Sequence, residues 1–115
     1  MVVKSRDIQI LHCVKEFIDN DFQKPITIGY LAREAGFQPG KLQHGFRQLF
    51  HMPVYTYLLQ VRMNKAMELL SQTDDLIKEI AAATGYKSTS SFTSAFKKCV
   101  KMTPTGYRER EGQYD

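Results

Sequence analysis

Two segments of this 115-residue chain bring together basic and hydrogen-bonding side chains. The stretch Tyr86–Lys101 contains four lysines and no acidic residue. In the stretch after Pro39, helical spacing places a polar set opposite an apolar stripe: Lys41, Gln43, His44, Arg47 and Gln48. Ammonium and guanidinium groups attract phosphate, and amide and imidazole groups form hydrogen bonds. Such segments could hold a polyanion, although a lysine-rich helix face is usually only solvated.

The reactive residue types do not converge on a catalytic arrangement. The sequence contains no paired-carboxylate, Ser/His/Asp or phosphate-loop pattern. His12, His44 and His51 lack the spacing of metal ligands, and two cysteines are too few for a disulfide framework. Cys99 falls on an apolar face and is expected to be buried. The sequence therefore predicts a protein that is not an enzyme and that holds no metal or cofactor.

One pattern that occurs twice must position both polar segments. It reads LAREAGFQPGKLQHGFRQLFHMP from Leu31 and IAAATGYKSTSSFTSAFKKCVKMTP from Ile80. The two copies align at an offset of 49 up to Gly36 and Gly85, and at an offset of 50 beyond them. The second offset pairs apolar positions with one another: Leu42 with Phe92, Phe46 with Phe96, Met52 with Met102, and Tyr57 with Tyr107. Each copy predicts a short helix, a glycine turn and a second helix, which is the outline of a helix-turn-helix.

The chain as a whole is predicted to be all-α, because no segment alternates with period two over strand length. We expect about seven helices in a single domain over residues 1–115. Its parts are a first helix-turn-helix over about 26–54, a linker helix over about 55–72, a second helix-turn-helix over about 75–108, and a polar, frayed tail over 109–115. Before these, Asp7 is expected to cap a helix that runs to about Phe22, and Thr27 to cap the helix Ile28–Ala35.

The charge distribution favours a polyanionic partner over a membrane. The net charge is +4, and residues 25–108 carry eleven basic against five acidic side chains, whereas residues 1–24 are balanced. No stretch approaches the roughly 18 consecutive apolar residues of a membrane span. The N-terminal residues lack the apolar region of a secretory signal, so a reducing cytoplasmic setting and no membrane partner are expected.

The repeated residues resemble the DNA-binding domain of AraC/XylS-type bacterial transcription regulators. The resemblance spans about Ile26–Arg108 and is carried by five segments: LAREAGF at Leu31, LQHGF at Leu42, RMNKAMELL at Arg62, IAAATGYKSTSSFTSAFKK at Ile80 and MTPTGYR at Met102. A double match with the connecting RxxxAxxLL helix is far more specific than a single helix-turn-helix. The resemblance implies sequence-specific binding of double-stranded DNA by a bacterial transcription regulator.

By this resemblance and by helix face, two sets of residues are expected to contact DNA. The second helix of each repeat is the expected recognition helix, called here a reader. The base contacts would be made by Gly40, Gln43 and His44 in the first reader, and by Thr89, Ser90, Ser91, Thr93 and Ser94 in the second. The phosphate contacts would be made by Lys41, Arg47, Lys87, Lys97 and Lys98. An amide can pair with both hydrogen-bonding groups of adenine, whereas short hydroxyls offer little such readout. The first helix is therefore expected to read most bases, and the second to grip the duplex and sense its shape.

The predicted linker helix suggests a two-part DNA site. Some 17 residues of helix are about 25 Å long, so the readers could lie in major-groove segments about one DNA turn apart, roughly 34 Å. Neither a palindrome nor a dimer would be needed.

The resemblance also implies partners beyond DNA. Activators of this family commonly contact RNA polymerase, and most members carry an effector-binding or dimerisation domain before this one. The chain is therefore either a stand-alone regulator or part of a longer protein, and we favour the second. The alternative function is a helical interaction module that docks on RNA polymerase or on another regulator.

Three residues depart from the family pattern. His51 and Lys101 replace the glycines that usually follow the two recognition helices, so either these residues adopt a left-handed conformation or the turns differ locally. Leu76 replaces a serine cap, and we expect Asp74 or Asp75 to cap that helix instead.

Overall fold

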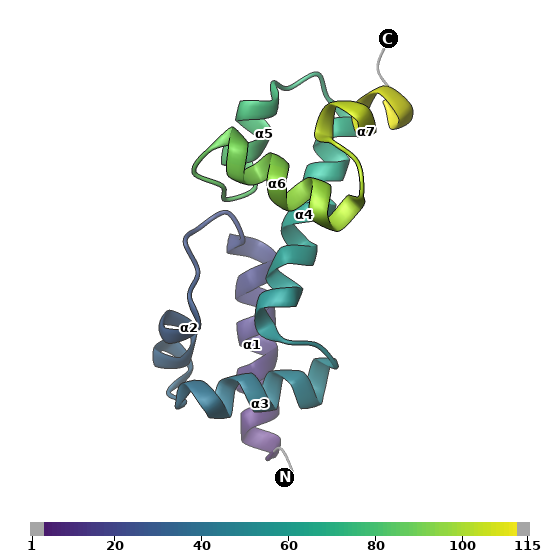
Figure 1. Cartoon of the computed structure of the whole chain (residues 1–115). Coiled ribbons are helices and arrows are strands. Elements are labelled where there is room, and N and C mark those ends of the chain that lie inside the picture. Colours follow the sequence, from purple (N-terminus) through teal and green to yellow (C-terminus); the bar gives the residue numbers. More distant parts are fainter. Residues whose placement is uncertain (1–3, 113–115) are drawn as a thin grey trace. The chain divides into compact units, whose positions relative to one another are not determined.

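The computed structural model describes residues 4–112 and confirms the all-α prediction. Over that range the chain forms seven helices (Figure 1): α1 Ser5–Asp21, α2 Ile28–Ala35, α3 Pro39–Phe50, α4 Val54–Gln72, α5 Ile77–Ala83, α6 Thr89–Val100 and α7 Pro104–Glu111. They divide into two compact units, unit 1 over Met1–Val61 and unit 2 over Arg62–Asp115, and the boundary falls within α4. Among the described helices, none combines the length and apolar character that crossing a bilayer requires.

Unit 1 is built around α3, whose apolar side packs against α1, α2 and the start of α4. Leu42 and Phe46 are fully buried, and the Phe46 ring centroid lies 4.6 Å from that of Phe50 and 5.9 Å from that of Tyr57. Gly45 is buried too, and it packs closely against α1, since a Cβ there would approach the Leu11 side chain to 3.0 Å. These positions are the ones that the three- and four-residue spacing of the sequence selects.

Unit 2 repeats this plan around α6. Phe92 and Phe96 are fully buried, and a chain of ring contacts links Tyr86 to Phe92, Phe92 to Phe96, and Phe96 to Tyr107 at centroid distances of 5.7, 5.8 and 5.7 Å. The second half of α4 and α5 supply further buried side chains: Met63, Ala66, Leu70, Ile80 and Ala81. The aromatic seam of the second repeat is therefore core, as its spacing predicts.

The backbone turns confirm the duplication and its change of offset. Gly36 and Gly85 have φ values of 73° and 95°, and the next residues, Phe37 and Tyr86, donate equivalent 2.9 Å hydrogen bonds to the carbonyls of Ala32 and Ala81. From the glycine to the N-cap of the next helix there are two residue steps in unit 1, to Gln38, and three in unit 2, to Ser88. The extra residue of the second repeat therefore lies in this turn.

Both residues that stand where glycine was expected adopt the left-handed conformation. His51 has φ 63° and Lys101 has φ 69°, and each backbone N–H closes on the carbonyl four residues earlier, in Arg47 and Lys97. The turns therefore keep a glycine-like geometry, at the steric cost that a Cβ imposes there.

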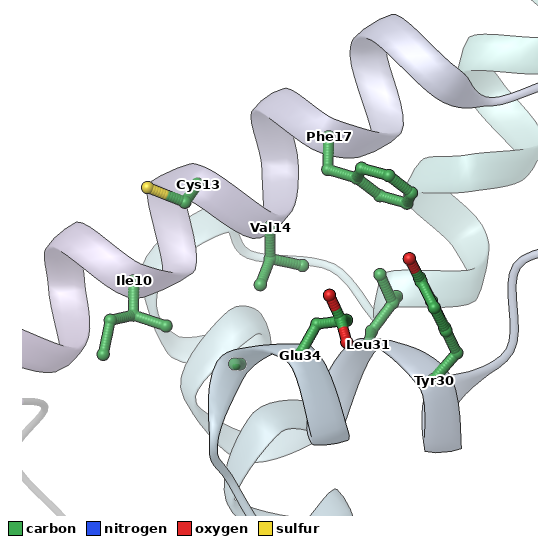
Figure 2. Close-up of a pocket in the computed structure, with 8 residues that line it drawn as sticks. Ile10, Cys13, Val14, Phe17, Tyr30, Leu31 and Glu34 are labelled. Atoms are coloured by element: carbon green, nitrogen blue, oxygen red, sulfur yellow. The ribbon is translucent and has the colours of Figure 1, made fainter.

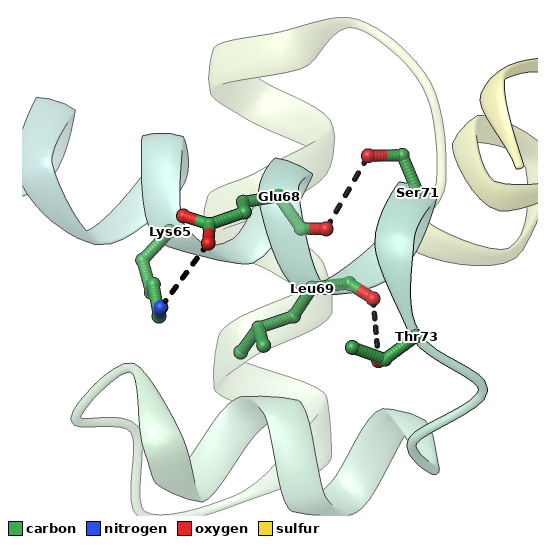
Figure 3. A network of polar contacts seen from close by, with 5 residues as sticks. All are labelled: Lys65, Glu68, Leu69, Ser71 and Thr73. Carbon is green, nitrogen blue, oxygen red and sulfur yellow. Dashed lines mark hydrogen bonds and ion pairs between the residues drawn. The ribbon is translucent and has the colours of Figure 1, made fainter. Parts of the chain in front are cut away.

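The end of α4 is fixed by side chains of its own last turn and of α7. Figure 3 shows the Ser71 hydroxyl donating to the Glu68 carbonyl (3.3 Å) and the Thr73 hydroxyl donating to the Leu69 carbonyl (2.7 Å). Arg108 donates from Nε to the Leu70 carbonyl and from Nη2 to the Thr73 carbonyl, both at 3.1 Å. The Arg108 contacts serve carbonyls at the helix end, which lack intrahelical partners, whereas the Leu69 carbonyl also accepts from the Thr73 backbone N–H at 3.1 Å.

Two capping predictions are wrong, and one is confirmed. Thr27 caps α2 by accepting from the Tyr30 N–H at 3.0 Å, as predicted. Helix α1 begins at Ser5 with Lys4 as its N-cap, so Asp7 lies inside the first turn. Helix α5 begins at Ile77 with Leu76 as its N-cap, and the Glu79 carboxylate accepts from the Leu76 N–H at 2.8 Å. Glu79 thus provides one half of a capping box, and neither Asp74 nor Asp75 is the cap that was predicted.

The predicted burial of Cys99 and the predicted fraying of the C-terminal tail are also wrong. Cys99 is exposed, as is Cys13, although Cys99 continues the apolar stripe of Phe92 and Phe96. The tail is not frayed from residue 109, because α7 continues to Glu111, and only residues 113–115 of the predicted tail lie outside the described range. The contacts of Arg108 with α4 hold this helix in place.

A polar contact joins α1 to α4 within unit 1. The Tyr57 hydroxyl donates to the Asp19 carboxylate, and Lys15 Nζ lies 3.4 Å from Asp19 Oδ2 and 5.2 Å from the Tyr57 ring centroid. Burial raises the pKa of Tyr57 above its usual 10.0, and its hydrogen bond to Asp19 adds to the shift. The hydrogen bond with Tyr57 raises the pKa of Lys15.

Because both pKa values are raised in the folded state, the stabilisation is present below about pH 10 and is lost as pH rises through the folded values. We expect Tyr57→Phe to lower the free energy of unfolding by about 0.5–1.5 kcal/mol at neutral pH. Above about pH 10, the free energy of unfolding of the variant should decrease less steeply with pH than that of the wild type. Urea denaturation across this pH range measures both effects. The control is Tyr55→Phe, since Tyr55 is 67% exposed; identical pH profiles for wild type and Tyr57→Phe would contradict this account.

Candidate nucleic-acid interface

The exposed side of α3 displays the first set of predicted base contacts. Gly40, Gln43 and His44 are all exposed, as is Arg47 one turn further on. A Cβ added at Gly40 would meet nothing within 4 Å, so packing within the chain does not require a glycine there. Helix α3 thus has one side in the core of unit 1 and a polar side that leaves room for close approach of a ligand.

Three of these residues share a hollow beside the start of α4. We name it the α3–α4 hollow; it measures about 330 Å³ and is lined by Ile28, Gln43, His44, Arg47, Pro53, Val54 and Tyr55. The side chains of Gln43, His44 and Arg47 are therefore brought together, as the helical spacing predicts. They combine an amide, an imidazole and a guanidinium, which suits hydrogen bonding to base edges and phosphates.

A second hollow lies at the C-terminal end of α3. This α3-end hollow measures about 530 Å³ and is lined by His44, Arg47, Gln48 and His51. His44 and Arg47 belong to both hollows, so the polar surface is continuous from Gln43 to the end of the helix. All the groups of the α3-end hollow can donate hydrogen bonds, and Arg47 is cationic.

Lys41, a predicted phosphate contact, is engaged within unit 1. Its ammonium lies 3.3 Å from Asp7 Oδ2 on α1 and 4.5 Å from the centroid of the Phe37 ring. The Asp7 side chain is only 12% exposed and the Lys41 side chain 51%. The ion pair joins α1 to α3 and compensates the carboxylate that α1 carries inward.

The second predicted reader, α6, begins with hydroxyl groups that serve its own cap. Ser88 is the N-cap, and its Oγ accepts from the Ser91 N–H at 3.1 Å. The Ser91 hydroxyl in turn donates to the Ser88 carbonyl at 3.1 Å and lies 3.0 Å from Ser88 Oγ. Ser91 is thus partly committed to the helix start, while its neighbours Thr89 and Ser90 are exposed without that role.

The remaining residues of the second set follow the exposed side of α6. Ser94, Lys97 and Lys98 are exposed, Thr93 is half-buried, and Lys87 is exposed in the turn before the helix. Lys97 and Lys98 lie in the last turn, where cations are favoured by the helix dipole. The structure thus gives α6 a basic C-terminal end and a hydroxyl-rich N-terminal end.

Three residues at this interface were missed by the sequence predictions. Tyr55 is 67% exposed and lines the α3–α4 hollow, His51 lines the α3-end hollow, and Ser88 caps α6. Ser88 could have been found, because a serine before a helix is a common N-cap. The places of Tyr55 and His51 depend on the geometry of the turn at Met52–Pro53 between α3 and α4, and helical spacing does not show this.

A third hollow in unit 1 is separate from this surface. Figure 2 shows it between α1 and α2, where it measures about 440 Å³. Its lining is mainly apolar and shares no residue with the α3–α4 or α3-end hollow: Ile10, Cys13, Val14, Phe17, Tyr30, Leu31, Glu34 and Ala35.

Comparison with known sequences points to one family. A family model described as "Helix-turn-helix domain" matches residues 31–110. The chain is 32% identical over 102 residues to the regulatory protein SoxS of Salmonella typhimurium, covering 89% of this chain and 95% of SoxS. It spans 43% and 32% of the length of two further curated transcriptional regulators.

Comparison with solved structures gives the same answer. The C-terminal domain of AraT, a response regulator from Geobacillus stearothermophilus, superposes with a TM-score of 0.89 at 27% identity, covering all of this chain and 93% of that domain. The DNA-binding domain of AdpA, crystallised in complex with a target DNA, has the same fold, with a TM-score of 0.82 at 22% identity over 87% of this chain and 90% of that one.

Proposed function

The chain belongs to the AraC-type family of helix-turn-helix transcription regulators, and we propose that it regulates transcription by binding specific sequences in double-stranded DNA. The observation that carries the proposal is the repeated amphipathic helix. In α3 and again in α6, buried aromatic residues at equivalent positions hold one side in a core, while the opposite side displays polar and basic groups. A helix so mounted fits the width of the B-DNA major groove.

The two recognition helices are proposed to differ in role, with α3 contacting most bases and α6 mainly binding the DNA backbone. Gln43 and His44 offer an amide and an imidazole to base edges, with Gly40 allowing close approach and Arg47 at the backbone. Thr89, Ser90, Thr93 and Ser94 offer short hydroxyls, and Ser91 supports the cap of its own helix. Lys87, Lys97 and Lys98 would then bind phosphates, so that α6 mostly grips the duplex.

Lys41 holds a weaker place in this proposal than the other cations. Its ammonium already has Asp7 as a partner at 3.3 Å, so a phosphate would have to share or replace that carboxylate. We therefore assign Lys41 to positioning α3 first, and to phosphate second.

The target is proposed to be two neighbouring major-groove segments on one duplex. The helix that joins the units, α4, contains 19 residues, a length of about 28 Å. Selection of bound sequences from a random DNA pool at two salt concentrations tests this. Two enriched motifs about ten base pairs apart, with affinity falling steeply as salt rises, are the expected result.

Activation through contact with RNA polymerase is a further part of the proposal. It rests on the family and on the likeness to SoxS, a regulatory protein. If the pool yields no enriched motif and no DNA is retained at low salt, DNA binding fails, and docking on polymerase or on another regulator becomes the leading function.

A further inference from the structure

His51 occupies a backbone conformation that glycine adopts at lower cost. Its φ of 63° lies in the left-handed region, where a Cβ crowds the following carbonyl oxygen. The turn itself needs only the backbone, because the His51 N–H closes on the Arg47 carbonyl at 2.8 Å. A conformational cost of this kind suggests that the side chain is retained for a function.

The side chain of His51 lies in a hollow whose other groups suit an anion. His44, Arg47 and Gln48 complete the α3-end hollow, and all four residues are exposed. Within residues 4–112, none of His44, Arg47 and His51 forms an ion pair or a side-chain hydrogen bond. Their donors are therefore available to a ligand, in contrast to Lys41, which is held by Asp7.

The backbone cannot supply the attraction for an anion at this place. The C-terminal end of a helix carries a partial negative charge, which favours cations. Any affinity for an anion must therefore come from the side chains, above all from the guanidinium of Arg47. At the equivalent position of unit 2, Lys101 has φ 69° and is also basic. A basic residue at both sites, where glycine would serve the turn better, points to the same use.

We propose that His51, together with Arg47, binds one phosphate of the DNA backbone beside the segment that Gln43 and His44 read. This deepens the proposed function and rests on it. Because a phosphate contact carries no base information, His51 contributes to affinity on every sequence alike. The conformational cost at His51 would then be offset by stronger binding of DNA at the end of α3.

The test is a pair of substitutions, His51→Gly and His51→Lys, measured for thermal stability and for DNA binding. The probes are a 20-base-pair duplex of the selected sequence and a scrambled duplex of the same length. His51→Gly is expected to raise Tm by about 2–5 °C, yet to weaken binding about tenfold on both duplexes. His51→Lys keeps a donor in place and is expected to bind within about threefold of wild type, with a salt slope steeper by about 0.9.

Each other outcome overturns the assignment. If His51→Gly binds both duplexes as tightly as wild type, His51 has no phosphate partner, while the proposed function stands. If His51→Gly lowers both Tm and affinity, the imidazole acts through the fold. If only the selected duplex is affected, His51 reads a base. Failure of the wild-type protein to bind either duplex would instead remove the proposed function itself.

Discussion

Replacing Phe46 with alanine is expected to lower the free energy of unfolding by about 3–5 kcal/mol, the usual cost of truncating a buried phenylalanine. Phe46 is fully buried and contacts the rings of Phe50 and Tyr57, so the truncation leaves a cavity in the middle of unit 1. Urea denaturation followed by far-ultraviolet circular dichroism measures the loss. Hydrogen exchange should place the loss of protection within residues 4–61.

The control for Phe46 is an exposed aromatic of the same unit. Tyr55→Ala removes a ring that is 67% exposed, and it should change stability by no more than about 0.5 kcal/mol. Phe96→Ala is the equivalent truncation in unit 2 and should shift the loss of protection to residues 62–112. A decrease below about 1 kcal/mol for Phe46→Ala would mean that the α3 core is not organised as described.

Replacing Gln43 with alanine is expected to weaken binding to the best DNA site by about 1–3 kcal/mol, equivalent to roughly 5- to 150-fold. Gln43 is exposed and lines the α3–α4 hollow with His44 and Arg47, where its amide can form two hydrogen bonds with one base. The variant should also relax the preference at one base position. A repeated pool selection with the variant measures both effects.

Gln60→Ala provides a matched control for Gln43. Gln60 is an exposed glutamine of α4 that lines neither of the two hollows at α3. Its truncation should leave affinity and sequence preference unchanged. If Gln43→Ala weakened selected and scrambled duplexes equally, Gln43 would be a backbone contact, and the reading of bases would have to lie elsewhere on α3 or on α6.

The fold could be predicted largely because the sequence contains it twice. Because the pattern repeats at offsets of 49 and 50, a position predicted to be buried in one copy has an equivalent position in the other copy that should also be buried. Leu42 and its equivalent Phe92 are both buried, as are Phe46 and its equivalent Phe96. The ring contact between Phe46 and Tyr57 likewise recurs between Phe96 and Tyr107, at 5.9 and 5.7 Å. Apolar periodicity and the turn glycines were sufficient for these features.

Two of the failed predictions, at Asp7 and at Cys99, concern how distant elements of the chain pack. Asp7 was expected to cap a helix, but its carboxylate pairs with Lys41, 34 positions later, and nothing local to either residue shows this. Cys99 continues an apolar stripe, yet periodicity shows only which side of a helix faces inward. It does not show how far along the helix other elements cover that side, and at Cys99 they do not.

The interface was predictable to the extent that it follows from helical faces. Gln43, His44 and Arg47 are brought together as expected, because three- and four-residue spacing places them on one side of α3. The roles of Ser91 in the α6 cap and of Tyr55 and His51 in the two hollows depend on turn geometry, which the periodicity of single helices does not contain.

The two exposed cysteines also make the protein a ready subject for distance measurements. Cys13 lies in unit 1 and Cys99 in unit 2, and the sequence contains no other thiol. A pair of maleimide fluorophores or nitroxide spin labels can therefore be attached to the natural sequence, with one label on each unit. Resonance energy transfer or pulsed electron spectroscopy would then follow how a duplex orients the two halves, without any engineered substitution.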